Sequence, residues 1–130
     1  RDADTFEFFV TLLDRPANDV IRAAHASLVR RSSQDLGNAK KKWTGWFAKH
    51  GTRHRVEWLI DGLMHSDERL RRRASDELEH LTQEYFGYDP GQSKKEREAT
   101  QRKSRLWWQR VGFRIFADES VSGSGHAQRQ

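Results

Sequence analysis

The sequence repeats itself at a spacing of 50 residues, and this spacing restricts the folds that the chain can adopt. Residues 7–37 align with residues 57–87 without a gap. The matching positions are Glu7 with Glu57, Leu13 with Leu63, Arg22 with Arg72, Ala24 with Ala74, Leu28 with Leu78, and Gly37 with Gly87. An internal repeat of this length is typical of proteins built from stacked structural units. The chain is therefore predicted to fold as two related units.

Apolar residues at helical spacing run through both units. In the second unit, a stripe about 80° wide predicts a helix over 70–85; its members are Leu70, Ala74, Leu78, Leu81 and Tyr85. Asp67 is the expected N-cap of that helix, and Gly87 is its expected stop. Val56, Leu59, Ile60 and Leu63 predict a shorter helix before a turn at 65–68.

The first unit has the same pattern. Phe6, Phe9, Val10 and Leu13 predict its first helix, a turn follows at 14–19, and Val20, Ala24 and Leu28 begin a second helical stripe. Arg31 and Asp35 stand where the second unit has Leu81 and Tyr85. Because they are four residues apart, we expect them to pair on a solvated helix face. The fold class predicted is all-α.

An aromatic pair followed by glycine closes each unit. Trp46, Phe47 and Gly51 match Trp107, Trp108 and Gly112 at a spacing of 61 residues, so the second unit carries an insertion within or near 88–98. The pair is expected to lie in a short third helix and to pack into the core. Adjacent helical side chains point about 100° apart, so one ring of each pair is expected to be partly exposed. The sequence does not decide which one.

The stretches "ERLRRRASDELEHLTQEYFGYDP" and "RLWWQ" (105–109) resemble the bacterial HEAT-like repeats of the HEAT/PBS-lyase-like group. The resemblance covers about residues 5–112 and implies a short alpha-solenoid. Its two repeats would span about 5–51 and 54–112, within a domain of residues 1–116, and residues 117–130 would form a flexible polar tail. Because solenoids usually need about three units, either unusual segments cap the two ends or, as we expect, the sequence is a fragment of a larger protein.

No catalytic or metal-binding pattern stands out in the sequence. There are no cysteines, which excludes disulfides, thiol catalysis and cysteine-based zinc sites. His50 and His54 are four apart, but Gly51 interrupts them and no HExxH motif is present. We therefore expect a noncatalytic protein without metal or cofactor. No apolar run approaches the roughly 20 residues that span a bilayer, so we expect a cytoplasmic protein.

Basic residues are the candidate contacts for a partner. The net charge is +5, and the runs at 39–43 and 69–73 and the segment 94–105 are rich in Lys and Arg. We select as candidate partner-binding residues Lys40, Lys41, Lys42, Arg69, Arg72, Arg73, Arg102, Lys103, Arg105 and Trp108. The HEAT resemblance implies a scaffold that binds another protein. The alternative is an electrostatic nucleic-acid-binding module, provided that several runs share one face.

Overall fold

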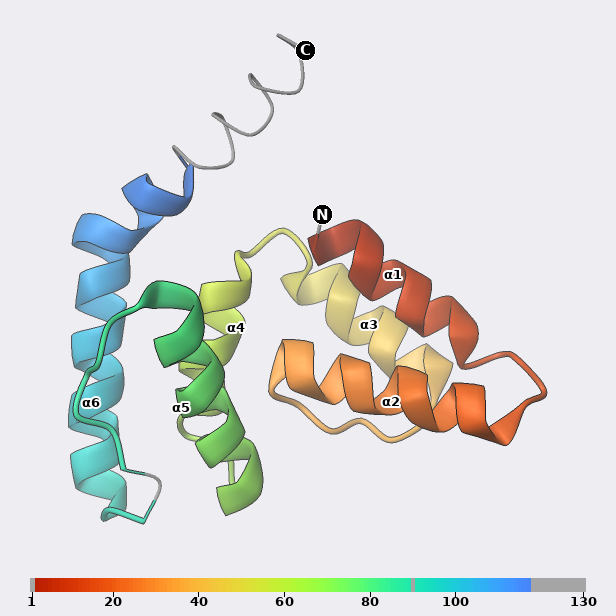
Figure 1. Ribbon diagram of the computed structural model, residues 1–130, viewed down its shortest axis with the longest axis horizontal. Coiled ribbons are helices and arrows are strands. Elements are labelled where there is room, and N and C mark those ends of the chain that lie inside the picture. The colour runs from red at the N-terminus through yellow and green to blue at the C-terminus, as the bar shows by residue number, and fades with distance from the viewer. Residues whose placement is uncertain (1, 90, 118–130) are drawn as a thin grey trace, which may run out of the picture.

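The computed structural model describes residues 2–89 and 91–117, and within these ranges the chain is all-α with no strand (Figure 1). Its elements are α1 (Asp2–Leu12), α2 (Asn18–Ser32), α3 (Lys40–His50), α4 (Arg55–Gly62), α5 (Glu68–Thr82), α6 (Lys94–Trp107) and the π-helical segment η1 (Trp108–Gly112). The prediction of an all-α fold is confirmed. None of the described helices is both long and apolar enough to cross a membrane.

The helices form two groups that lie side by side (Figure 1). In the first group, α1 packs against α2 and α3, and in the second group, α4 packs against α5 and α6. The two groups meet where α2 contacts α4. The core of the first group consists of Phe6, Val10, Leu13, Ala24, Leu28, Val29, Trp43, Trp58 and Leu70. The core of the second consists of Val56, Leu59, Ile60, Leu63, Ala74, Leu78, Tyr88 and Trp108.

The second helices of the two groups correspond closely. Both α2 and α5 have 15 residues, and their bounds differ by 50 positions. Each ends at a residue in the left-handed region, Ser33 and Gln83, both with φ of 59°. In this conformation the backbone N–H of each residue reaches the carbonyl four residues back and caps the helix. Gly37 and Gly87 then take φ values of 70° and 76°, which glycine adopts without strain.

The predicted start of α5 is confirmed, whereas its predicted end is not. Asp67 is the N-cap of α5, as predicted, and its carboxylate accepts a hydrogen bond from the N–H of Arg69 at 2.9 Å. The predicted end of that helix is wrong, because α5 stops at Thr82. Tyr85 therefore lies beyond the helix with 72% of its surface exposed, rather than on the buried stripe.

The expected pair between Arg31 and Asp35 is also wrong. Since α2 ends at Ser32, Asp35 is not on the helix, and it interacts with Nε2 of His25 at 2.7 Å. Arg31 instead lies 3.6 Å from the carboxylate of Asp2 and over the ring of Phe9. Ala117, the first residue of the predicted tail, is still helical, and residues 118–130 lie outside the described residues.

Both aromatic pairs pack against the cores, as predicted, but only the second pair divides into a buried and a partly exposed ring, since Trp46 and Phe47 are both partly buried. Trp46 and Phe47 lie against the first core, where Phe47 stacks on Phe6 with ring centroids 5.0 Å apart. Trp108 is the more buried ring of the second pair, with 8% exposed, and Trp107 is partly buried against the same core.

The glycine after each pair is explained by a ring that covers it. A Cβ at Gly112 would lie 2.3 Å from Cζ3 of Trp107, and one at Gly51 would lie 2.6 Å from the carbonyl oxygen of Phe47 and 2.9 Å from its ring. No side chain fits at such distances without a shift of its neighbours. The repeated spacing of aromatic pair and glycine is therefore a packing requirement.

The π-helical segment lies between Trp107 and Phe113. The N–H of Phe113 reaches the carbonyl of Trp108, five residues back, where an α-helix would use the residue four back. The wider turn buries Trp108 and Gly112 together. Helical structure continues over residues 113–117 and carries Phe113 and Phe116 toward α4.

Candidate binding surfaces

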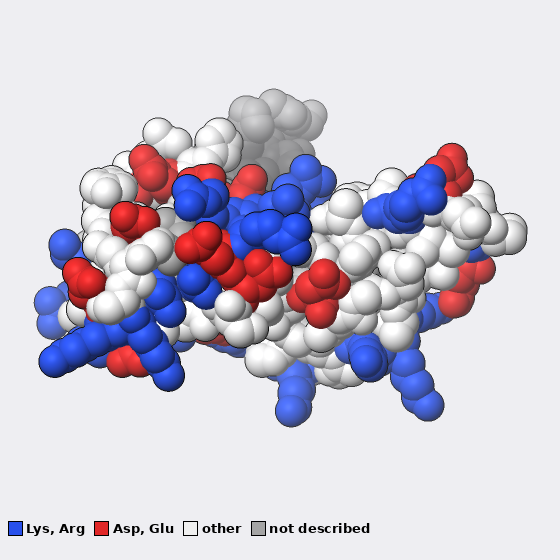
Figure 2. All heavy atoms as spheres, turned by 90° about the horizontal axis from the view of Figure 1, so that it is seen from below, with Lys and Arg blue, Asp and Glu red and all other residues white. Residues whose placement is uncertain are grey.

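The basic residues selected from the sequence lie in three separate places. Lys40, Lys41 and Lys42 begin α3; Arg69, Arg72 and Arg73 lie in the first two turns of α5; and Arg102, Lys103 and Arg105 lie in the last turns of α6. Viewed from below, Lys and Arg form several groups with Asp and Glu among them (Figure 2). On this face the positive side chains therefore do not form one continuous track.

Some of these cations are already engaged. Lys40 forms an ion pair with Asp14. Arg105 lies 2.8 Å from a carboxylate oxygen of Asp61, whose other oxygen takes Arg53 at the same distance. These two arginines hold the pKa of Asp61 below its usual value against the opposing effect of burial. Arg105 therefore helps to attach α6 to α4.

The three arginines of α5 that were selected from the sequence line a groove between α2 and α5. We call it the arginine groove; its volume is about 610 Å³, and it is lined by Ala26, Arg30, Arg69, Arg72, Arg73, Asp76 and Glu77. Arg30 was not selected from the sequence. Nothing in its local pattern separates it from other exposed arginines, because only the tertiary fold brings it to the groove.

Most of the charge in the arginine groove is not neutralised within the described part of the chain. Arg30, Arg72 and Arg73 form no ion pair with a described residue, and the closest approach of Arg69 to a carboxylate is 3.6 Å, to Asp67. Among the acids of the groove, Glu77 is already bound to Arg55 at 2.9 Å. The groove therefore presents an excess of positive charge, with Asp76 as its remaining unpaired carboxylate.

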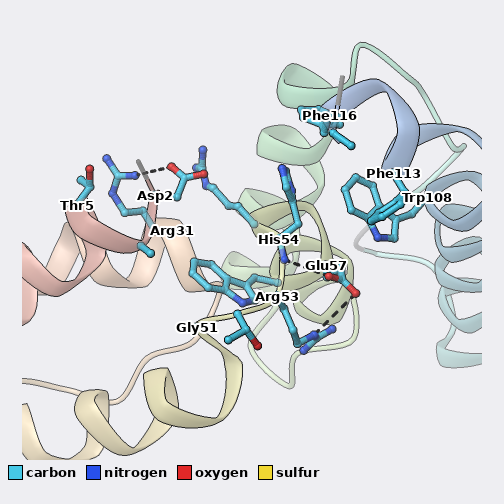
Figure 3. A pocket seen from close by; sticks show the side chains of 15 residues that line it. Asp2, Thr5, Arg31, Gly51, Arg53, His54, Glu57, Trp108, Phe113 and Phe116 are labelled. Atoms are coloured by element: carbon cyan, nitrogen blue, oxygen red, sulfur yellow. Dashed lines mark hydrogen bonds and ion pairs between the residues drawn. The ribbon is translucent and has the colours of Figure 1, made fainter. Parts of the chain in front are cut away.

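A second depression, the junction hollow, lies between the two helical groups (Figure 3). Its volume is about 780 Å³, and residues from α1, α2 and α4 and from the segment after α6 line it. Aromatic residues contribute much of the wall: Trp58, Trp108, Phe113 and Phe116. Its arginines are paired within the protein, Arg31 with Asp2, Arg53 with Asp61 and Arg55 with Glu77. The junction hollow thus offers less free charge than the arginine groove.

His54 sits at the centre of the junction hollow (Figure 3). It is the N-cap of α4. The ring Nδ1 accepts a hydrogen bond from the backbone N–H of Val56, and the backbone N–H of His54 donates to the carboxylate of Glu57. The imidazole lies 4.9 Å from the rings of both Trp108 and Phe116. Burial lowers the pKa of His54 below 6.5, so the neutral ring is favoured.

The described residues contain no cluster of three or more His, Asp or Glu side chains that could hold a metal ion. His50 and His54 do not converge on a common point: His50 packs against Trp46, whereas His54 caps α4. The expectation of a noncatalytic protein without cofactor stays a prediction.

No family model, curated protein or solved structure matches the chain in the three comparisons.

Proposed function

We propose that the protein is a noncatalytic binding module made of two HEAT-like repeats, and that it holds an acidic segment of a protein partner in the arginine groove. The correspondence of α2 with α5, down to the φ angles of Ser33 and Gln83, supports the repeat interpretation. The common packing order, in which the first helix of each group contacts the second and the third, supports it as well. Such units typically bind partners through extended surfaces.

The free charge of the arginine groove is the observation that carries the proposal. Arg30, Arg72 and Arg73 line one groove and form no ion pair with a described residue, whereas Arg53 and Arg105 share the carboxylate of Asp61. A guanidinium presents several N–H donors in a plane that matches both oxygens of a carboxylate. Because two helices contribute these groups, the groove can engage several carboxylates of one segment.

Nucleic acid is the alternative partner, and the exposed cations outside the arginine groove favour it. Lys41, Lys42, Arg102 and Lys103 form no ion pair with a described residue and add to the net charge of +5. A nucleic acid, however, gains most from a continuous line of phosphate contacts. The groups in Figure 2 are interrupted by acids, and Asp76 and Glu77 lie inside the arginine groove itself. The mixed charge favours a protein segment.

Fluorescence anisotropy with two kinds of labelled probe tests the proposal. One is a peptide rich in Asp and Glu, and the other is single- or double-stranded DNA, each titrated at increasing salt. The double substitution Arg72→Glu/Arg73→Glu reverses the charge of the groove. The matched control Lys41→Glu/Lys42→Glu makes the same change of net charge on α3, outside the groove.

We expect the peptide to bind, the Arg72→Glu/Arg73→Glu variant to lose at least about tenfold in affinity, and the control to lose far less, since the groove arginines act together on one bound segment and the lysines of α3 lie outside it. Equal losses in both variants would mean that net charge alone attracts the peptide, and the groove proposal would fail. Tighter binding of DNA than of the peptide, weakened by both variants, would favour the nucleic-acid alternative.

A further inference from the structure

The contact between the two helical groups is centred on Trp58. This residue belongs to α4, but its side chain is 98% buried in the core of the first group, where it lies 5.1 Å from Trp46. Its indole N–H donates a hydrogen bond to the carbonyl of His50 at 2.9 Å. Thus α4, the first helix of the second group, places a large aromatic ring against α3, the third helix of the first group.

The position equivalent to Trp58 in the first group is exposed. Phe8 lies 50 residues before Trp58, on α1, and 57% of its surface is accessible. Phe8 therefore occupies the position of an inserting ring, and no described residue covers it as the first core covers Trp58. The exposed residues beside it include Asp4 and Glu7, and α1 contains no basic residue.

The residues of α3 that contact Trp58 have equivalents at the end of α6 and in the segment after it, on the other side of the molecule, and these equivalents are partly or fully exposed. Trp107 and Val111 lie 61 residues after Trp46 and His50, the two residues of α3 that Trp58 contacts in addition to Phe6 of α1. Val111 and Ile115 are 44% and 43% exposed, and Trp107 is only partly buried. Arg110 and Arg114 are exposed beside them, and residues 108–117 contain no acid. This surface therefore combines apolar area with positive charge.

We infer that two copies of the chain associate head to tail, with Phe8 of one copy packed on Trp107, Val111 and Ile115 of the other. The inference rests on the repeat correspondence proposed above. Its partner is a second copy of the chain, which is distinct from the acidic segment proposed to bind in the arginine groove. The acidic α1 surface would face Arg110 and Arg114, so the charges are complementary. In Figure 1, α1 and α6 lie on opposite sides of the molecule. The contact is therefore heterologous, and each added copy leaves a free surface for the next.

Sedimentation velocity over a range of protein concentrations tests this inference with the variants Phe8→Glu and Val111→Glu. Both substitutions fall at exposed positions, so circular dichroism should show unchanged helix content. We expect the unsubstituted chain to form species larger than its 15.3 kDa monomer as concentration rises, and each variant alone to stay monomeric. The control is Leu106→Glu, a similarly exposed apolar residue of α6 that should leave the association unchanged.

Mixing the two variants distinguishes this arrangement from a symmetric one. Phe8→Glu keeps an intact receiving surface and Val111→Glu keeps an intact inserting ring, so an equal mixture should form a heterodimer that grows no further. A mixture that stays monomeric would overturn the inference, as would an unsubstituted chain that is monomeric at every concentration. Loss of association in Leu106→Glu to the same extent would also overturn it, because the apolar contact would then lie elsewhere. Peptide binding is measured separately, so either proposal can fail alone.

Discussion

His54 links the protonation of one side chain to the start of α4. Its Nδ1 can accept the hydrogen bond from Val56 only while it carries no proton, and burial lowers its pKa below 6.5. A group whose pKa is lower in the folded state stabilises the fold above its unfolded pKa. We therefore expect the free energy of unfolding to be highest above about pH 6.5 and to fall as the pH drops through the folded pKa of His54.

The substitution His54→Asn measures this contribution. Asparagine is a good N-cap but does not titrate, so the variant should lose the part of the pH dependence that His54 supplies. Chemical denaturation of both proteins at a series of pH values between neutral and acid gives the difference in unfolding free energy. A difference that does not change with pH would show that the imidazole titrates equally in the folded and unfolded chain.

Gly112 and Gly45 should respond in opposite directions to the same substitution. The Cβ of Gly112→Ala would meet the ring of Trp107 at 2.3 Å, so the ring must move and the protein should lose about 1–3 kcal/mol of stability. Gly45 lies inside α3 with no other atom near its Cβ position, so Gly45→Ala should gain about 0.5–1 kcal/mol from helix propensity. Thermal melts compare the two variants, and a stable Gly112→Ala protein would show that the ring relocates freely.

At the scale of single helices, α2 and α5 differ at their N-caps. Asp67 caps α5 with its side chain, whereas Ala17 holds the corresponding position of α2 and offers no hydrogen bond. We expect Asp67→Ala to lower the free energy of unfolding and Ala17→Asp to raise it by a similar or smaller amount. Equilibrium denaturation measures both. If Ala17→Asp has no effect, the backbone around residue 17 does not place the carboxylate where Asp67 places its own.

The sequence was informative about these helices because the relevant signals are local. The positions of α2 and α5 follow from apolar spacing and from the offset of 50 residues, and the cap at Asp67 follows from residue type. The end of α5 at Thr82 is not predicted, because the left-handed residue that follows it is Gln83 and not the glycine that usually marks a helix end.

The binding surfaces were harder to predict because they arise from packing between helices. Arg69, Arg72 and Arg73 could be selected as a run, but Arg30 joins them only because the fold brings residues of α2 and α5 to the same groove. The pair of His25 and Asp35 likewise joins α2 to the loop that follows it, and it depends on α2 ending at Ser32. The π-helical turn at residues 108–112 has no distinct composition, since it depends on how Trp108 and Gly112 fit the second core.

At the scale of the whole molecule, Trp58 should determine whether the two helical groups unfold together. Replacing it by alanine removes a buried ring and a hydrogen bond to the carbonyl of His50, and should cost about 3–5 kcal/mol. Tyr85→Ala, at a site with 72% of its surface exposed, should change stability by less than about 0.5 kcal/mol.

Two probes of unfolding, helix circular dichroism and tryptophan fluorescence, should give the same midpoint for the unsubstituted chain. In Trp58→Ala they should separate, because the coupling between the groups is weakened. Coincident transitions in that variant would show that the remaining contacts of α2 with α4 couple the groups on their own.

The membership of the two cores also sets an order for folding during synthesis. The first core includes Trp58 and Leu70 from the second group, whereas the second core takes no buried residue from the first. A ribosome makes the chain from its N-terminus, so α1, α2 and α3 leave it before the residues that complete their core. The N-terminal half must therefore wait, with part of its apolar surface open, until residue 70 has emerged. The half that is made first is thus the half that depends on the other.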